Sequence, residues 1–296
     1  MIPIVDLAAD DETVREGLRR AFEEIGFVVV TGHGVGPDRL GSIVDAARAF
    51  FALAADDKFA CAPQRWNPNA SNRYRGYFPS EAHGKEGLDL GDPGLDDSHA
   101  ELLAHPYYER NVYAERLGSE WVEAIDAYFE IMTPLATRIV FEALRAIDAT
   151  PAWTEASFAR PTAQTTLRFN CYPTETALAS SDPDAPELFC EAHYDSTVLT
   201  LLHQDRQGGL QVRDTERRWI DVPFLEDAFV VNTGRALQIA SGDRYPATIH
   251  RVVPTADARI SIPFFLEPKW DAPIGDESYE IYLERVMQRL PEYVDR

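Results

Sequence analysis

The sequence predicts a helical N-terminal half that supports an all-β C-terminal half built as a sandwich or barrel. Before Pro151, apolar residues recur mainly at helical spacing, with short strand-like runs between the helices. After Pro151 the pattern changes to short apolar runs, which turn residues such as Gly208 and Gly209 separate. Many short strands at a spacing of about 8–12 residues are typical of a sandwich or a barrel.

A helix and a short strand are expected near the N-terminus. The helix covers 10–25, with Asp10 or Asp11 placed to cap its start and Gly26 to end it. Its apolar positions at helical spacing are Val14, Leu18, Phe22 and Ile25. The β-branched run Phe27–Val30 that follows is expected to form a strand.

The next part of the chain alternates between helical and irregular patterns. A second amphipathic helix is expected over 40–51, and residues 62–114 then hold Pro, Gly, Asn and Asp with scattered aromatic residues. Because so long an irregular stretch is usually functional, we expect it to form a wall or lid of a site. A helical pattern over 115–148 follows, and Pro134 is expected to kink it or split it in two.

The C-terminal half holds the predicted strands of the sandwich or barrel. They lie at 164–172, 196–204, 209–214, 218–223, 228–234, 236–241, 248–254 and 259–267. A final helical stripe within 276–290 consists of Tyr279, Tyr282, Leu283, Val286, Met287 and Leu290. We expect this last helix to pack on the outside of the barrel.

Composition and charge exclude several classes of partner. The 296 residues are 45% hydrophobic and 26% charged, which is typical of a chain that buries its own core. The 28 basic and 49 acidic residues give a formal net charge of −21, which would repel nucleic acid and an anionic membrane face. No apolar run approaches the ~18 residues of a membrane span, and the first residues lack the pattern of a secretory signal. Three cysteines without a C-x-x-C pair predict a reducing compartment, so we expect a cytoplasmic protein.

Two histidines and one carboxylate on one face can hold a metal ion that activates dioxygen. The corresponding sequence form is His-x-Asp/Glu followed much later by a histidine, and three copies of its first part begin at His99, His193 and His203. His99 lies in an irregular acidic segment, and His203 precedes a turn, so each is expected to be an ordinary polar residue. His193 and Asp195 lie at the mouth of a predicted strand over 193–204, where residues two apart share one face.

Further candidates lie on neighbouring predicted strands. His250 opens a short apolar strand and is the distal histidine that best completes the set with His193 and Asp195. Arg259 and Ser261 again share a strand face and could clamp a carboxylate, because an arginine binds it bidentately and a serine adds a third hydrogen bond. Taken alone, each of these side chains would be read as a core histidine or an ordinary ion pair.

The order of the motifs is more specific than any one of them. Asn170-Cys-Tyr172, the His-x-Asp of His193, QDRQGGLQV, VVNTG, YPATIHRVV and RISIPFF follow one another, each on a predicted strand or turn. With the opening IPIVDL, the segment GFVVVTGHGV and the loop RGYFP, this order resembles the isopenicillin N synthase-like family of non-haem Fe(II), 2-oxoglutarate-dependent oxygenases. The resemblance covers nearly the whole chain.

The resemblance implies a mainly β fold, a double-stranded β-helix (jelly-roll, cupin-like) core supported by N-terminal and C-terminal helices. It implies an N-terminal dioxygenase region at 1–114, a supporting helix pair at 115–150, an oxygenase jelly-roll at 151–275 and a C-terminal helix at 276–296. His193, Asp195 and His250 would be the catalytic ligands of Fe(II). Arg259 and Ser261 would bind the distal carboxylate of 2-oxoglutarate, and Tyr172 with Asn170 would contact its metal-proximal end. His33 matches a loop histidine that is usually structural.

The implied function is a dioxygenase that couples O2 and 2-oxoglutarate to the hydroxylation, desaturation or cyclisation of a small molecule, releasing succinate and CO2. The resemblance also implies ascorbate as a reductant. We expect the protein to be a monomer or a weak homo-oligomer. One alternative is a 2-oxoglutarate-independent oxidase of the isopenicillin N synthase or aminocyclopropane carboxylate oxidase type. Another is a binding protein with a decayed iron site, against which the intact set of five side chains argues.

The substrate-facing candidates are the loop Arg73–Tyr77 and Phe265. Arg73, Arg75 and Arg168 are cationic residues in an acidic chain, and one of them could bind a substrate carboxylate. The ordinary interpretation of each is a structural or surface ion pair.

Overall fold

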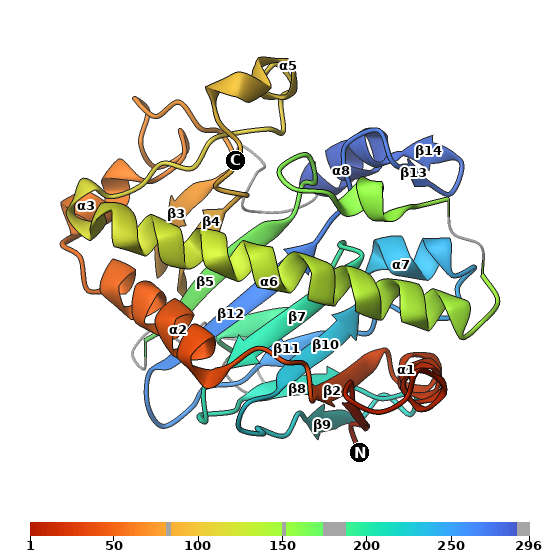
Figure 1. Ribbon diagram of the computed structural model, residues 1–296. Helices are drawn as coiled ribbons and strands as arrows, with labels where there is room; N and C mark the ends of the chain where they lie inside the picture. Colours follow the sequence, from red (N-terminus) through yellow and green to blue (C-terminus); the bar gives the residue numbers. More distant parts are fainter. Residues whose placement is uncertain (81–83, 150–151, 174–187, 289–296) are drawn as a thin grey trace.

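The computed structural model describes residues 1–296 except 81–83, 150–151, 174–187 and 289–296 (Figure 1). Two β-sheets form its core, and the larger one has eight strands. In spatial order these are β1 (Ile4–Asp6), β2 (Phe27–Thr31), β10 (Phe229–Thr233), β7 (Leu199–Gln204), β12 (Arg259–Leu266), β5 (Thr166–Tyr172), β4 (Glu86–Leu90) and β3 (Gly76–Phe78). The smaller sheet consists of β6 (Cys190–His193), β11 (His250–Val252), β8 (Leu210–Arg213) and β9 (Trp219–Asp221). The chain is a double-stranded β-helix, as the sequence predicts.

Helices cover one face of the large sheet, and α6 runs across it as a single long rod (Figure 1). The described helices are α1 (Asp11–Glu24), α2 (Pro37–Phe51), α3 (Ala55–Ala60), α5 (Ala100–Leu103), α6 (Gly118–Arg145), α7 (Arg235–Ala240) and α8 (Tyr279–Met287), with 3-10 turns at Asp97–His99, Glu115–Leu117 and Glu155–Phe158. A short hairpin of β13 (Pro273–Ile274) and β14 (Glu277–Ser278) precedes α8. None of the described helices combines the length and apolar character that crossing a bilayer requires.

The first helix begins and ends where the sequence predicts. The Asp10 carboxylate accepts a hydrogen bond from the backbone N–H of Thr13 at 3.0 Å, which caps α1. Gly26 ends it with a φ of +67°, and a Cβ there would lie 2.4 Å from the carbonyl oxygen of Pro246. The turn between α1 and β2 therefore requires glycine both for its backbone conformation and for its close approach to another loop.

The expectation that Pro134 splits the long helix is wrong, because α6 is continuous through it. A proline removes the hydrogen bond to the carbonyl four residues earlier, here that of Glu130. Glu130 and Pro134 both lie on the exposed side of α6, where water can hydrate the freed carbonyl. The supporting helix pair expected at 115–150 is thus one helix, while the division of the chain into four regions stays a prediction.

The strand expected at 236–241 is also wrong, because these residues lie in α7 and the turn after it. Ala236, Leu237 and Ser241 are buried and the positions between them are partly exposed, which is a helical spacing. Gly234 stands at the N-cap of this helix. The mostly apolar run at 236–241 is so short that its sequence fits a strand as well as one and a half helical turns.

The strand expected over 193–204 is divided between the two sheets. His193 is the last residue of β6 in the small sheet, and β7 of the large sheet begins only at Leu199. Asp195 therefore lies in the crossover between the sheets. Our expectation that His193 and Asp195 share one face of a single strand is therefore wrong.

Side chains of β12 alternate between the helical core and the opposite face of the sheet. Phe264 is fully buried, with its ring centroid 5.2 Å from that of Phe129 on α6 and 6.1 Å from that of Tyr128. Phe265 points to the other face and is partly exposed to a cavity. One face of β12 therefore packs against the helices, through Phe264, and the other faces the cavity, through Phe265.

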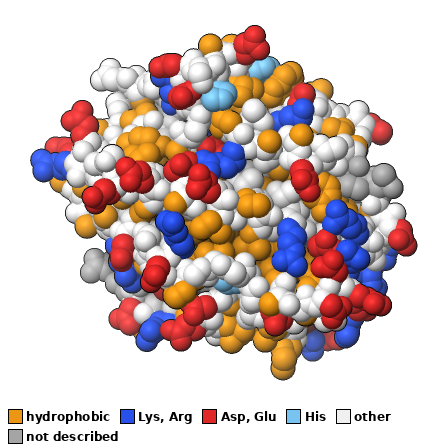
Figure 2. All heavy atoms as spheres, in the orientation of Figure 1, with side chains coloured by type: hydrophobic (Ala, Val, Ile, Leu, Met, Phe, Trp, Pro, Cys, Tyr) orange, Lys and Arg blue, Asp and Glu red, His pale blue; other side chains and the backbone are white. Residues whose placement is uncertain are grey.

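Charged side chains of both signs are interspersed over the molecular face in Figure 2. Many arginines pair with carboxylates, for example Arg15 with Glu142 at 2.5 Å, linking α1 to α6. Arg19 on α1 likewise pairs with Glu16 and Glu23 of the same helix. In so acidic a chain, a cation without a carboxylate partner is therefore informative.

We predict that Phe264→Ala lowers the free energy of unfolding by about 3–5 kcal/mol, because it empties a buried site between β12 and α6. Phe265→Ala is the matched control on the same strand, and it should cost less than half as much, because its ring faces the cavity. Denaturant unfolding of both variants measures the difference. Equal losses would show that the two faces of β12 do not divide as described.

Candidate active site

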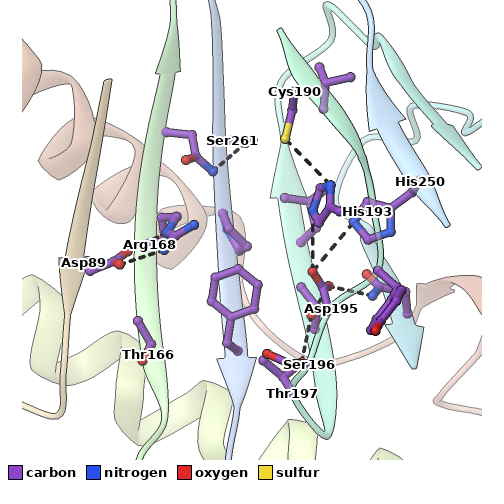
Figure 3. A pocket seen from close by; sticks show the side chains of 18 of the residues that line it. Asp89, Thr166, Arg168, Cys190, His193, Asp195, Ser196, Thr197, His250 and Ser261 are labelled. Atoms are coloured by element: carbon purple, nitrogen blue, oxygen red, sulfur yellow. Dashed lines mark hydrogen bonds and ion pairs between the residues drawn. The ribbon is translucent and has the colours of Figure 1, made fainter. Parts of the chain in front are cut away.

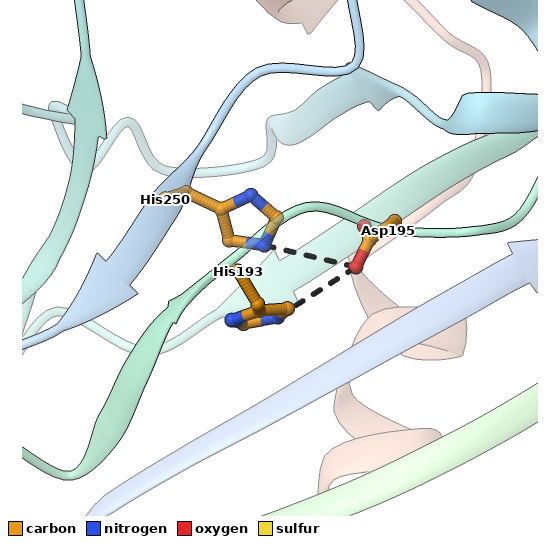
Figure 4. A group of neighbouring side chains, drawn as sticks. All are labelled: His193, Asp195 and His250. Carbon is orange, nitrogen blue, oxygen red and sulfur yellow. Dashed lines mark ion pairs between the residues drawn. The ribbon is translucent and has the colours of Figure 1, made fainter. Parts of the chain in front are cut away.

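Pairing between β6 and β11 brings two histidines together. The strands are antiparallel, and His193 lies directly opposite His250, with their ring centroids 4.3 Å apart. Asp195 Oδ1 lies 3.8 Å from His193 Nε2 and 3.7 Å from His250 Nε2 (Figure 4). One ligand atom from each side chain lies within 4.8 Å of the other two, which is the arrangement of a three-ligand metal site.

Backbone carbonyls orient both imidazoles. His193 Nδ1 lies 2.8 Å from the carbonyl oxygen of Glu191, and His250 Nδ1 lies 3.1 Å from that of Thr248. Each Nδ1 donates its proton to a carbonyl, so each Nε2 faces the shared space and offers its lone pair there when the imidazole is neutral. Histidines that bind a metal are commonly oriented by such a hydrogen bond from the other ring nitrogen.

Two polar side chains of the large sheet hold the carboxylate. Asp195 Oδ2 accepts hydrogen bonds from Thr200 Oγ1 on β7 at 2.6 Å and from Asn232 Nδ2 on β10 at 2.7 Å. These bonds occupy one carboxylate oxygen and leave Oδ1 directed at the histidines. Sequence reasoning gave Thr200 and Asn232 no role, although a polar residue inside each of two apolar strands was the available signal.

Asp195 and His250 have the protonation states that metal binding requires. Burial alone would raise the pKa of Asp195, but the two imidazoles and the hydrogen bonds from Thr200 and Asn232 lower it below its usual range. Burial lowers the pKa of His250 to about 4. The aspartate is therefore ionised and His250 neutral, as metal binding requires. Against the effect of burial, Cys190 and Asp195 raise the pKa of His193 to about 9, so a metal ion has to displace a proton from this imidazole.

The other histidine motifs lie elsewhere, as expected. His99 Nδ1 lies 3.0 Å from Asp96 Oδ1 in a 3-10 turn, and His203 packs against Phe229 with the ring centroids 6.0 Å apart. His33 Nε2 lies 2.8 Å from the carbonyl oxygen of Asp227, which is a structural contact. Within the described part of the chain, none of these histidines belongs to a group of three potential metal ligands.

The predicted carboxylate clamp lies on β12 and β5, which are paired in register. Arg259 is opposite Tyr172 and Ser261 is opposite Asn170, so all four side chains share one face. The guanidinium lies 5.0 Å from the centre of the Tyr172 ring, and Asn170 Nδ2 donates to Ser261 Oγ at 3.4 Å. Gln204 on the next strand accepts a hydrogen bond from Arg259 Nη2 at 3.3 Å.

Arg259 is buried with part of its guanidinium unsatisfied. It is only 1% exposed, and neither Nε nor Nη1 has a hydrogen-bond partner among the described residues. A buried cation without an anion is strongly unfavourable, so these donors indicate a ligand that supplies a carboxylate. The residues present therefore fit a bound dicarboxylate.

A cavity of about 570 Å³ joins the metal-ligand group to this clamp (Figure 3). The irregular segment 62–114 lines it through Tyr74, Arg75, Lys85 and Asp89, and the ends of β6 and β11 line its other side. The last helix also reaches it, through Leu283, Val286 and Met287. This helix, which we expect on the outside of the barrel, thus also contributes to the cavity lining, and its predicted position Leu290 lies outside the described residues.

The three candidate arginines differ in their surroundings. Arg168 pairs bidentately with Asp89 at 2.5 and 2.7 Å, and its guanidinium lies between the rings of Phe78 and Phe265. Arg73 is exposed and does not line the cavity. Arg75 lines the cavity, as does Phe265.

Glu267 is a buried carboxyl of the cavity that sequence reasoning missed. Its Oε1 accepts a hydrogen bond from Tyr279 on α8, and its Oε2 lies 3.4 Å from Thr166 Oγ1. Burial raises its pKa to about 7. Glu267 lies two residues after Phe265, so strand alternation predicts that both side chains point to the same face, and this was the available signal.

Together, the fold and the site define a non-haem iron oxygenase, and comparison with known proteins identifies the family. Residues 163–268 match the 2OG-Fe(II) oxygenase superfamily, and residues 2–114 match the family described as non-haem dioxygenase in morphine synthesis N-terminal. The 2-oxoglutarate-Fe(II) type oxidoreductase hxnY of Emericella nidulans is 31% identical over 88% of this chain and 75% of its own length. The chain belongs to the 2OG-Fe(II) oxygenase superfamily.

Other relatives agree with this assignment. Isopenicillin N synthase of Streptomyces clavuligerus is 27% identical over 99% of this chain and 92% of its own length. The crystal structure of the rice dioxygenase for auxin oxidation superposes with a TM-score of 0.72 at 27% identity, covering 97% of this chain and 95% of the other. The protein is therefore an oxidoreductase, a dioxygenase that uses Fe(II), 2-oxoglutarate and O2.

We predict that His250→Ala lowers Fe(II) affinity more than about 100-fold, because loss of a second-shell partner alone typically costs 10–100-fold. His203→Ala is the matched control and should bind Fe(II) like the wild type. Anaerobic calorimetry with Fe(II) measures both affinities. If His203→Ala lost Fe(II) binding instead, our assignment of the metal-binding histidines would be wrong.

We also predict that Glu267→Gln changes the pH dependence of stability. The native pKa of Glu267, about 7, lies above the ordinary glutamate value of 4.5, so unfolding releases a proton between these values and wild-type stability falls as pH rises through this window. The variant cannot ionise here, so its stability relative to the wild type should rise by up to about 1.4 kcal/mol per pH unit and level off above pH 7. Denaturant unfolding from pH 4.5 to 8 tests this, and parallel curves for the two proteins would contradict it.

Proposed function

We propose that His193 Nε2, Asp195 Oδ1 and His250 Nε2 hold Fe(II), and that Arg259 and Ser261 bind the distal carboxylate of 2-oxoglutarate. Asn170 and Tyr172 would contact the metal-proximal end of this cosubstrate. The convergence of three ligand atoms within 4.8 Å is the observation that carries the proposal. The unsatisfied guanidinium of Arg259 in the same cavity supports the position of the cosubstrate.

When bound, iron and 2-oxoglutarate supply the activation of O2, with release of succinate and CO2. The protein side chains bind and orient the metal, the cosubstrate and the substrate. Arg259 holds a dicarboxylate in a water-poor site, where each charge-assisted hydrogen bond is stronger than in bulk water. Thr200 and Asn232 keep the Asp195 carboxylate in one rotamer and ionised. The cavity then positions a carbon of the second substrate beside the ligand group, where it loses hydrogen in hydroxylation, desaturation or ring closure.

The surroundings of the site favour a small molecule as the substrate. A cavity of about 570 Å³ lies within the range of small-molecule sites. The net charge of −21 opposes binding of nucleic acid or an anionic membrane. We propose that the enzyme acts as a monomer or weak homo-oligomer in the cytoplasm, and its three cysteines, which include no C-x-x-C pair, favour a reducing compartment.

The direct test is anaerobic addition of Fe(II) and then 2-oxoglutarate to the purified protein. A visible charge-transfer band should appear only when both are present, because the cosubstrate must chelate the bound metal. Admission of air, with ascorbate as the reductant, should then release succinate. The absence of both the band and calorimetric metal binding would overturn the proposal.

We predict that Arg259→Leu weakens 2-oxoglutarate binding at least about 100-fold, because two charge-assisted hydrogen bonds at roughly 1.5–3 kcal/mol each are lost. Arg251→Leu is the matched control. Arg251 lies on β11, donates to Gln211 and packs over Trp219, outside the clamp. Titration of the charge-transfer band with 2-oxoglutarate measures both affinities, and an unchanged affinity in Arg259→Leu would refute the clamp.

A further inference from the structure

The cavity contains a second arginine, Arg75, that forms no ion pair with a carboxylate of the described residues, at the end away from Arg259. Arg75 Nη1 donates to Thr166 Oγ1 at 3.1 Å and its Nη2 donates to the carbonyl oxygen of Gln164 at 3.0 Å. Both acceptors are neutral, and none of the ion pairs between described residues involves the Arg75 guanidinium, although its charge opposes the rise in the pKa of the nearby Glu267 carboxyl. Arg168, which lines the same cavity, is by contrast neutralised by Asp89.

The position of Arg75 is built into the fold. A Cβ at residue 91 would lie 2.9–3.0 Å from the guanidinium, so Gly91 leaves the space that the side chain occupies. Glu267 shares Thr166 with Arg75 but directs Oε1 to Tyr279. Because burial raises the pKa of Glu267 to about 7, this carboxyl neutralises Arg75 only in part at neutral pH.

The strand register relates Arg75 to the metal-ligand group. Thr200, which holds Asp195, is opposite Phe265 on β12, and Phe265 is opposite Thr166 on β5. Since neighbouring strands lie about 4.8 Å apart, Thr200 and Thr166 are separated by roughly 10 Å at the same level of the sheet. Figure 3 shows Thr166 and Asp195 on either side of the strand that carries Ser261.

The cavity that joins these two points includes apolar residues in its lining. Phe265 forms the floor, and Leu283, Val286 and Met287 of α8 line the cavity as well. An apolar body placed here gains burial against both surfaces. A ligand that spans the space would present a carbon to the metal-ligand group at one end and an anion to Arg75 at the other.

We propose that the substrate is a small carboxylic acid whose carboxylate binds Arg75 and whose oxidised carbon lies several bonds away, across Phe265. This inference rests on the proposed function and adds the substrate class to it. Arg75 is then the specificity-determining residue, since an arginine binds a carboxylate bidentately and a neutral ester or amide loses the charge assistance.

The test is substrate-stimulated succinate release by the complete Fe(II) enzyme. The panel contains straight-chain and phenyl-substituted monocarboxylic acids and α-amino acids, each with its methyl ester, so it also distinguishes the sources of the carboxylate. We expect acids with several carbons beyond the carboxylate to stimulate release at least about ten-fold more than their esters. If no acid gives a response that its ester lacks, the proposal is wrong.

Variants locate the effect at Arg75. Arg75→Gln should lower kcat/KM for the best acid by about 10- to 100-fold, mainly through KM, and Arg75→Lys should restore part of it. Arg73→Gln, an exposed position outside the cavity, is the matched control and should match the wild type. An Arg75→Gln enzyme that keeps wild-type KM for the acid overturns the assignment.

The result also separates this inference from the proposed function. A wild-type protein that forms no charge-transfer band with Fe(II) and 2-oxoglutarate refutes the proposed function. A protein that forms the band but treats acids and esters alike refutes only the role of Arg75. The ester comparison needs no variant, so it decides the question even where Arg75→Gln fails to fold.

Discussion

The antiparallel pairing of β6 with β11 is the constraint on which the site depends. It sets His193 opposite His250 in a sheet of short strands, although the two residues lie far apart in the chain. The chain then leaves β6 and crosses to the large sheet, and Asp195 lies in this crossover, held by Thr200 and Asn232. The ligand group therefore joins the two sheets, and its geometry requires both to be in place.

The large sheet performs two tasks because its side chains alternate between two faces. One face packs against α6 through residues such as Phe264 and supplies the core. The other face carries Arg259 and Ser261 toward one end of the cavity, and Phe265 and Glu267 toward the other. A single strand thus positions the proposed cosubstrate clamp and the proposed substrate-facing residue in a fixed order, and the helical layer packs behind it.

The sequence was sufficient to predict site residues that belong to motifs, but not site residues whose role depends on tertiary contacts. His193, Asp195 and His250 followed from spacing and order, and the structure brings them together. Thr200 and Asn232, which hold Asp195, are single polar residues in apolar strands. Asn232 lies 37 residues from Asp195 in the chain, and nothing in its local pattern connects the two. Pro134 shows the opposite limit, since a local helix breaker is tolerated where the freed carbonyl faces solvent.

Iron-edge anomalous scattering from crystals soaked anaerobically with Fe(II) and 2-oxoglutarate tests the central claim most directly. The account predicts one iron peak bonded to the two imidazole Nε2 atoms and to one oxygen of Asp195, with the far carboxylate of the cosubstrate on Arg259. An iron peak that lacks any of these three bonds, or a cosubstrate carboxylate placed away from Arg259, would contradict it.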